Sequence, residues 1–262
     1  MPELAHLRVE GVSKRFGSTE RAVAAIDGVS FEVRRGAFLS ILGPSGCGKS
    51  TLFNIIAGLM QPSAGDVRIE DESVILRPGH VGYMLQKDLL LPWRSIEDNI
   101  TLGQTLRGEK KKAARKAAAG LIARCGLSGF ENNRPHELSG GMRQRAALLR
   151  TLLTGKDLLL LDEPFGALDA ITRLQLQLLL TDVWQEMKKT ILFVTHDVDE
   201  ALLLSDEVLL LSARPGRVLR RFSVEMPRPR KPEMLADPAV AALKAEIMRL
   251  LWKEVDHSAA EE

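Results

Sequence analysis

Cysteine and tyrosine are scarce in this chain, and it has no long apolar run. Its 262 residues include two cysteines, one tyrosine and 5% aromatic residues. Two cysteines cannot build the disulfide framework of a small secreted domain, which favours a reducing compartment. No stretch approaches the roughly 18 uninterrupted apolar residues of a transmembrane helix, and the N-terminus lacks the apolar run of a signal peptide. We expect no membrane span, so any membrane association would come through another subunit.

Strong charge is missing as well. The formal net charge is +2 at pH 7, which gives no strong attraction to nucleic acid, so we expect no nucleic-acid partner. The 45% hydrophobic and 27% charged residues are typical of a globular protein. The length suits one large α/β domain with a substantial core and is short for two independent domains.

The N-terminal third predicts strands followed by a loop and a helix. Apolar residues alternate with polar ones, as in half-buried strands, at Leu7, Val9, Val29, Phe31 and Val33. A more continuous apolar run, Phe38–Leu42, ends directly at a glycine-rich loop. Apolar residues then recur at helical spacing, at Leu52, Ile55, Ile56 and Leu59.

Strand signals vanish from about residue 91 to 156, where residues 110–124 and a segment that begins at Ser139 predict helices. Strands return at 158–161, 191–194 and 208–211. A helix between the first two is predicted to carry Ile171, Leu174, Leu178 and Trp184 on its apolar side. Strands that alternate with helices indicate a mostly parallel sheet flanked by helices, with the helical stretch as an inserted subdomain.

The C-terminal part is predicted to leave the sheet. Residues 227–232 contain three prolines, which indicates a stiff linker that cannot join a sheet. One amphipathic helix follows, with apolar positions at Val240, Leu243, Ile247, Leu250 and Val255. We expect a main domain over residues 1–232 and a helical extension over 233–262. This helix could pack on its own domain or across a dimer.

The glycine-rich loop has the pattern G-x-x-x-x-G-K-[ST], formed by Gly43, Pro44, Ser45, Gly46, Cys47, Gly48, Lys49 and Ser50. Its glycines let backbone N–H groups curl around phosphate oxygens at a helix start, with Thr51 beside them. Lys49 can reach the β- and γ-phosphates, and the Ser50 hydroxyl suits Mg²⁺. Cys47 is a small residue at a tight position, for which we expect no catalytic role. The strand before the loop and the helix after it favour a nucleotide site over an ordinary glycine-rich turn.

Two carboxylates end the leucine run at 158–161. A carboxylate at a buried strand end is costly unless a cation or hydrogen bonds meet it, so Asp162 is a candidate ligand of Mg²⁺, held through Ser50 or through water. Glu163 could orient or deprotonate an attacking water.

A second anion site is predicted at Ser139-Gly140-Gly141, where a helix start offers bare N–H groups, a hydroxyl and a positive dipole end. A plain flexible turn is the alternative. Two phosphate-seeking sites on one chain suggest that each ATP is held by both, with the second site supplied by another copy.

Together with Thr195-His196, these segments resemble the ATP-binding cassette (ABC) ATPases over roughly residues 5 to 220. The resemblance implies a P-loop NTPase core with an antiparallel β subdomain and an inserted α-helical subdomain. It implies ATP hydrolysis with Mg²⁺, with Glu163, His196 and Lys49 as catalytic residues. Phe16 matches the aromatic that stacks on adenine, Gln86 the glutamine that senses Mg²⁺ and the γ-phosphate, and Asp169 a loop that crosses the dimer seam.

A finer resemblance, to importers of nitrate, sulfonates and taurine, lies in residues 86–93 and 212–217. It implies a homodimer in the ATP-bound state, integral-membrane permease subunits, an extracytoplasmic solute-binding protein and a place at the cytoplasmic face of the inner membrane. Residues 87–99 would then receive a cytoplasmic helix of the permease, although ordinary packing within the subdomain is the alternative. The resemblance implies uptake of a small anion or sulfonate-like solute, but the particular solute cannot be read from this chain, because it contacts the permease and the binding protein.

Two other classes of protein use related motifs. Soluble ABC ATPases of DNA repair or translation resemble this chain, but they carry long coiled-coil insertions or two cassettes. Small-molecule kinases and GTPases share the phosphate loop, yet neither needs the Ser139-Gly140-Gly141 segment, and the guanine-reading Asn-Lys-x-Asp is missing here.

Overall fold

The computed structural model describes residues 5–17, 22–166 and 168–260, with residues 257–260 described for the backbone alone. The chain forms two compact units. Unit 1 comprises Met1–His80 with Lys189–Glu262, and unit 2 comprises Val81–Lys188.

One sheet of unit 1 is antiparallel. Its order is β2-β1-β4-β5, with β1 at Ala5–Phe16, β2 at Val23–Arg34, β4 at Ala64–Ile69 and β5 at Glu72–Ser73. The predicted alternation is confirmed, because Leu7, Val9, Val29, Phe31 and Val33 are all buried. This sheet is the antiparallel β subdomain that the sequence predicted.

The second set of strands in unit 1 is mostly parallel. Strand β3 (Phe38–Leu42) lies between β8 (Thr190–Val194) and β9 (Glu207–Leu211) and runs parallel to both. Strand β10 (Val218–Ser223), which the sequence did not predict, is antiparallel to β9. All residues of β3 and β8 are buried, as expected for parallel strands covered on both faces. Helices α1 (Lys49–Ile56) and α7 (Val198–Leu204) follow β3 and β8.

Unit 2 is mainly helical. Strand β6 (Gly82–Met84) pairs in parallel with β7 (Leu158–Asp162). The helices are α2 (Ile96–Ile100), α3 (Leu102–Leu106), α4 (Lys111–Arg124), α5 (Gly140–Leu152) and α6 (Ala170–Met187), with a 3₁₀ turn η1 at Pro135–Glu137. The helical character predicted between residues 91 and 156 is therefore confirmed.

The predicted apolar side of α6 was wrong at its start. Ile171 is 73% exposed, whereas Leu176, Leu180, Val183 and Trp184 are buried. Leucines occur all round this helix, so the sequence period alone did not fix which side is covered.

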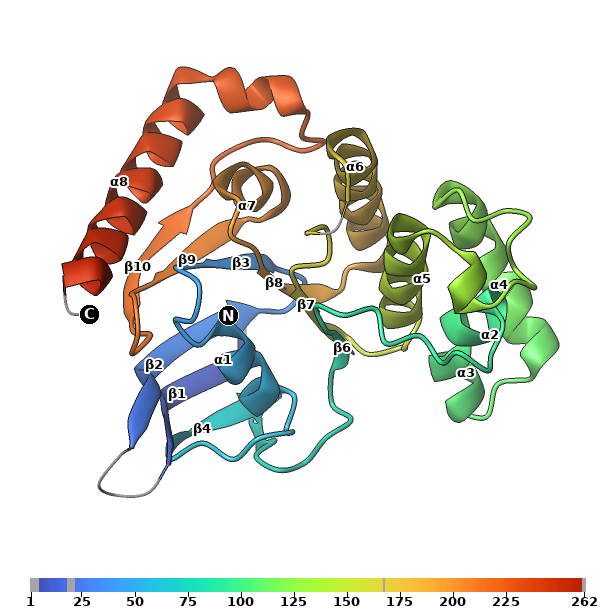
Figure 1. Ribbon diagram of the computed structural model, residues 1–262, viewed down its shortest axis with the longest axis horizontal. Coiled ribbons are helices and arrows are strands. Elements are labelled where there is room, and N and C mark those ends of the chain that lie inside the picture. The colour runs from blue at the N-terminus through green and yellow to red at the C-terminus, as the bar shows by residue number, and fades with distance from the viewer. Residues whose placement is uncertain (1–4, 18–21, 167, 261–262) are drawn as a thin grey trace. The chain divides into compact units, whose positions relative to one another are not determined.

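The C-terminal helix α8 (Pro238–Ala260) packs on unit 1, after a 3₁₀ turn η2 at Pro232–Ala236. Ile247 is fully buried in one cluster with Ala201 of α7, Phe222 of β10 and Met226. Figure 1 shows α8 running beside β10 and α7. Of the two arrangements left open by the sequence, the structure has packing on its own domain. Among the helices in the described part of the chain, none combines the length and apolar character required to cross a bilayer.

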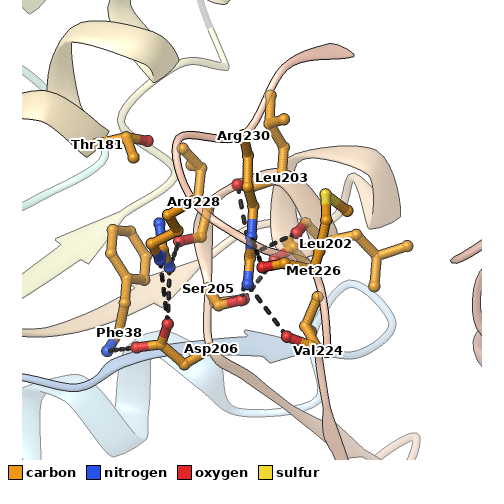
Figure 2. A network of polar contacts seen from close by, with 12 residues as sticks. Phe38, Thr181, Leu202, Leu203, Ser205, Asp206, Val224, Met226, Arg228 and Arg230 are labelled. Atoms are coloured by element: carbon orange, nitrogen blue, oxygen red, sulfur yellow. Dashed lines mark hydrogen bonds and ion pairs between the residues drawn. The ribbon is translucent and has the colours of Figure 1, made fainter. Parts of the chain in front are cut away.

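The proline-rich segment before α8 lies outside the strands, as predicted. It also anchors itself to unit 1 through two arginine side chains. Arg230 is 4% exposed, and its guanidinium donates to the carbonyls of Leu202 (2.8 Å), Ser205 (2.6 Å), Val224 (3.1 Å) and Met226 (3.1 Å). Figure 2 shows these carbonyls converging on Arg230. Burial and the nearby Arg228 charge lower the pKa of Arg230 to about 10, so it stays charged at neutral pH.

Arg228 makes a second anchor. Its Nη2 donates to Asp206 Oδ1 at 2.8 Å and to the carbonyl of Leu204 at 2.7 Å. The other carboxylate oxygen of Asp206 accepts from the backbone N–H of Phe38 at 3.0 Å, as Figure 2 shows. The segment therefore fixes the C-terminal end of α7 and the start of β3.

Candidate nucleotide site

The glycine-rich loop joins β3 to α1 in unit 1, as the sequence predicted. Gly48 has φ +100° and caps α1 in the left-handed conformation. An added Cβ there would lie 2.5 Å from Ile26 Cγ2, and one at Gly43 would lie 2.9 Å from Cys47 Sγ. Only glycine fits at Gly48 without displacing its neighbours, so the curled shape of the loop is built into the sequence.

Lys49 lies inside the curl of this loop. Its Nζ donates to the carbonyls of Gly43 at 2.7 Å and Pro44 at 2.8 Å. Ser45, Gly46 and Ser50 are exposed, and Thr51 is half-buried. An ammonium and a row of accessible loop groups beside a helix start can bind phosphate.

Cys47 is buried in the same loop, with Sγ 3.6 Å from Lys49 Nζ. Burial raises the pKa of Cys47, although the Lys49 charge opposes the shift. A neutral, enclosed thiol suits the predicted packing role.

The oxygen donors present fit a magnesium ion that is bound mainly through a nucleotide. No group of three or more His, Cys, Asp or Glu side chains able to hold a metal occurs among the described residues. Mg²⁺ usually takes one or two protein oxygens and completes its shell with phosphates and waters. Within unit 1, the exposed Ser50 hydroxyl is one such donor.

His196 follows β8 in unit 1 and is exposed. The backbone on both sides of it is fixed by hydrogen bonds. Thr195 Oγ1 donates to Glu200 Oε2 at 2.6 Å and accepts from the N–H of Asp197 at 3.0 Å. Asp197 caps α7 by accepting from the N–H of Asp199 at 2.8 Å. The ring is thus presented from a well-held turn.

Phe16 is the last residue of β1 and is 40% exposed. The Lys14 ammonium lies 5.3 Å from its ring centroid, a cation–π contact. An exposed aromatic face in unit 1 can stack on a base, and its exposure argues against a purely core role.

The two carboxylates lie at the end of β7 in unit 2. Asp162 is buried. The pKa of Tyr83 is raised by the burial of the Tyr83 side chain and by the nearby Asp162 charge. Glu163 has φ +48° and accepts a 3.2 Å hydrogen bond at Oε2 from Gln86 Nε2. The structure thus brings together Gln86 and Glu163, which lie far apart in the sequence.

Ser139 is the N-cap of α5, as predicted, because its Oγ accepts from the N–H of Met142 at 3.3 Å. Gly140 and Gly141 form the first positions of the helix, and Gly140 is exposed. An added Cβ at Gly141 would lie 3.2 Å from Leu168 Cδ2. The helix start is therefore exposed at Gly140 and closely packed against Leu168 at Gly141.

Asp169 has a structural task that sequence reasoning missed. It caps α6, because Oδ1 accepts from the N–H of Thr172 at 3.0 Å, and this bond lowers the pKa of Asp169. Of the loop motif that contains it, Ala167 lies outside the described residues.

Sequence reasoning also missed a polar link within unit 2. Arg143 Nε pairs with Asp88 Oδ2 at 3.1 Å, and Arg150 donates to the carbonyls of Asp88 and Leu89. The signal was the spacing, because residues seven apart on a helix lie on one face.

Proteins of known type resemble this chain. A family model described as ABC transporter matches residues 26–166. The taurine import ATP-binding protein of Rhizobium johnstonii is 42% identical over 257 residues, covering 95% of this chain and 98% of that protein. An aliphatic sulfonates import ATP-binding protein of Bacillus cereus is 41% identical over 222 residues, covering 85% of this chain and 87% of that protein.

A solved structure has the same fold. The ATP-binding cassette MJ0796, in a dimeric post-hydrolysis state bound to ADP and Pi, superposes with a TM-score of 0.76 at 29% identity, covering 84% of this chain and 99% of that one. The predicted fold class, a P-loop NTPase core with β and helical subdomains, is confirmed.

Proposed function

Because the chain belongs to the ABC transporter family and is an ATPase, we propose that it is the ATP-hydrolysing subunit of an importer. It couples Mg-ATP binding and hydrolysis to the movement of separate membrane subunits. Relatives named for taurine and aliphatic sulfonate import support a small anion or sulfonate-like solute as cargo.

In this proposal the phosphate loop and Lys49 bind the β- and γ-phosphates, and Phe16 stacks on adenine. Ser50 and Gln86 would hold Mg²⁺, with Asp162 contributing through water. The ion would neutralise charge on the phosphate oxygens. The single observation that carries the assignment is Lys49, held by two loop carbonyls within a loop whose curl requires glycine at Gly48.

Glu163 is the proposed general base. Its carboxylate accepts the proton of the attacking water, while Gln86, 3.2 Å away, orients that carboxylate. His196 contacts the γ-phosphate from the turn that follows β8.

The second grip on ATP comes from another copy of the chain. Two copies pair head to tail, and each nucleotide lies between one phosphate loop and the Ser139-Gly140-Gly141 helix start of the other copy. The exposure of Ser139 and Gly140 at that helix start and the dimeric state of a related cassette support this arrangement.

Permease subunits dock on residues 87–99, at the cytoplasmic face of the membrane. Leu89 is 53% and Trp93 is 69% exposed. Asn99, fully buried, holds the backbone beneath them by accepting from the N–H of Leu91 at 2.7 Å and donating to the carbonyl of Ser95 at 2.9 Å. Such a fixed apolar surface suits a cytoplasmic helix of the permease. A solute-binding protein acts through the permease.

The test is Glu163→Gln. We expect ATP binding to persist, turnover to fall about 100-fold or more because a general base is lost, and ATP to hold a lasting dimer. Phosphate release and sedimentation measure the two effects. Glu186→Gln, at an exposed acid of α6 paired with Arg124, is the matched control and keeps wild-type turnover. Turnover of Glu163→Gln within tenfold of wild type would remove Glu163 from the role of base.

A further inference from the structure

Two arginines of α5, Arg143 and Arg150, contact the loop that follows Gln86. Arg150 donates to the carbonyl of Asp88 at 2.6 Å and to that of Leu89 at 2.7 Å. Leu89 has φ +43°, a left-handed conformation that a branched side chain rarely adopts. The arginine therefore stabilises a loop conformation that the local sequence disfavours, and in that conformation the Leu89 side chain faces outward.

Arg143 joins the same loop to the helix start that carries Ser139. Its Nε pairs with Asp88 Oδ2 at 3.1 Å, and its Nη1 donates to the carbonyl of Leu138 at 2.7 Å. Leu138 directly precedes Ser139, so one planar guanidinium touches the exposed loop and the residue before the N-cap. The other carboxylate oxygen of Asp88 accepts from the N–H of Leu90 at 3.2 Å. The Arg143 side chain therefore links Asp88 directly to the residue that precedes Ser139.

From these contacts we propose that Arg143, Arg150 and Asp88 are positioning residues that couple the Leu89–Trp93 surface, residues 89–93, to the Ser139-Gly140-Gly141 helix start. A partner that shifts this surface shifts the helix start, and a nucleotide gripped by the helix start shifts the surface by the same coupling free energy. The inference rests on the proposed function, in which the surface receives a permease helix and the helix start grips ATP.

The position of the Asp88–Arg143 pair favours coupling over simple stabilisation. Both side chains are about one third exposed, and ion pairs at such sites contribute little to folding stability. Arg145 offers the contrast on the same helix, because its Nη1 donates to the carbonyl of Cys125 at 3.1 Å, away from the loop. If Arg143 acts in coupling, substitutions of Arg143 and Arg145 should have different effects on the surface. If both arginines only stabilise the fold, the two substitutions should have similar effects.

The experiment uses the full chain with Glu163→Gln, so that bound ATP persists. A nitroxide is attached at Trp93→Cys, since Cys47 and Cys125 are buried and resist labelling. Sedimentation reports ATP-driven dimerisation, and the nitroxide line shape reports the mobility of the surface. We expect Mg-ATP to drive the dimer and to change the line shape. Asp88→Asn and Arg143→Gln should still form the dimer at saturating ATP, but the change at residue 93 should shrink about fivefold or more.

Control variants make the result specific. Arg145→Gln should keep the full change, and Asp88→Glu, which retains the carboxylate, should restore most of it. A full change in Arg143→Gln, or an equal loss in Arg145→Gln, overturns the coupling while the ATP-driven dimer stands. If the Glu163→Gln chain forms no dimer with Mg-ATP at all, the proposed function fails and the coupling fails with it.

Discussion

Arg230→Met should destabilise unit 1 more than any exposed arginine substitution. In the native chain one guanidinium satisfies four carbonyls at 3.1 Å or less, two from the end of α7 and its cap and two from the chain after β10 (Figure 2). Methionine fills a similar volume but donates no hydrogen bond. The carbonyls at the C-terminal end of α7 would then lose their cation as well as their donor.

The magnitude follows from two opposing contributions. Four hydrogen bonds to a charged group, at about 1.5 kcal/mol each, amount to roughly 6 kcal/mol. Burial and the nearby Arg228 charge lower the pKa of Arg230 from 12.5 to about 10, so removing the charged group from this unfavourable environment returns about 3 kcal/mol. The net loss is about 3 kcal/mol, which lowers the melting temperature of a chain of this size by on the order of 10 °C.

Urea and thermal unfolding, followed by circular dichroism, measure this loss. Hydrogen exchange of the α7 amides locates it, since these should exchange faster in the variant. Arg217→Met is the control, because Arg217 is largely exposed and pairs with Asp27 at the surface; it should cost about 1 kcal/mol or less. If Arg230→Met costs no more than this control, the carbonyls do not depend on Arg230 and the reasoning is refuted.

Four other outcomes are expected. Ser139→Arg should leave monomer affinity for ATP nearly unchanged and block ATP-driven dimerisation in sedimentation; an unchanged dimer would show that this helix start is not at the seam. Burial raises the pKa of Cys125 to about 12, so Ellman's reagent should not react with it at pH 8 until urea unfolds the chain, and fast native reaction would contradict its burial. Because the unfolded thiol ionises near pH 9 and the folded one does not, this group's contribution to stability should be lost as pH rises from about 9 to 12. Ile247→Ala should lower the free energy of unfolding in urea by about 2–4 kcal/mol, since Ile247 is the fully buried side chain of α8 in the cluster with α7 and β10; a loss below about 1 kcal/mol would mean that α8 does not belong to the core.

Many elements of the fold could be predicted from patterns among residues that are adjacent in sequence. The strand, loop and helix around Gly48 were predictable because the apolar run, the glycines and the helical spacing are adjacent in sequence. The N-cap at Ser139 was predictable for the same reason, since an N-cap bonds only two or three residues ahead. Such features depend on neighbours along the chain, not on the tertiary fold.

Features that depend on distant partners were not predictable. Arg230 sits in a run of prolines and basic residues that resembles a solvated linker, and its acceptors come from two separate segments, around residues 202–205 and 224–226. Strand β10 was missed because only Phe222 among its residues is buried. Ile171 was misplaced because α6 carries leucines on every side.

The strand register determines which polar residues lie side by side after the strands end, and sequence patterns do not predict this register. In unit 2, Met84 of β6 pairs with Leu161 of β7. Two residues beyond this pair lie Gln86 and Glu163, which are hydrogen-bonded. A run of four leucines before Asp162 has no alternation that could fix this pairing.

Unit 1 repeats the same geometry. Ile41 pairs with Val194, and two residues beyond them lie Gly43, which opens the phosphate loop, and His196. Parallel strands end at a common edge, so each pair delivers its polar residues to that edge of its own unit. A slip of one residue in β8 would offer Thr195 or Asp197 in place of His196, and would also turn the buried side chains of β8 to the opposite face. The tight packing of that fully buried strand is therefore what holds the histidine at its position.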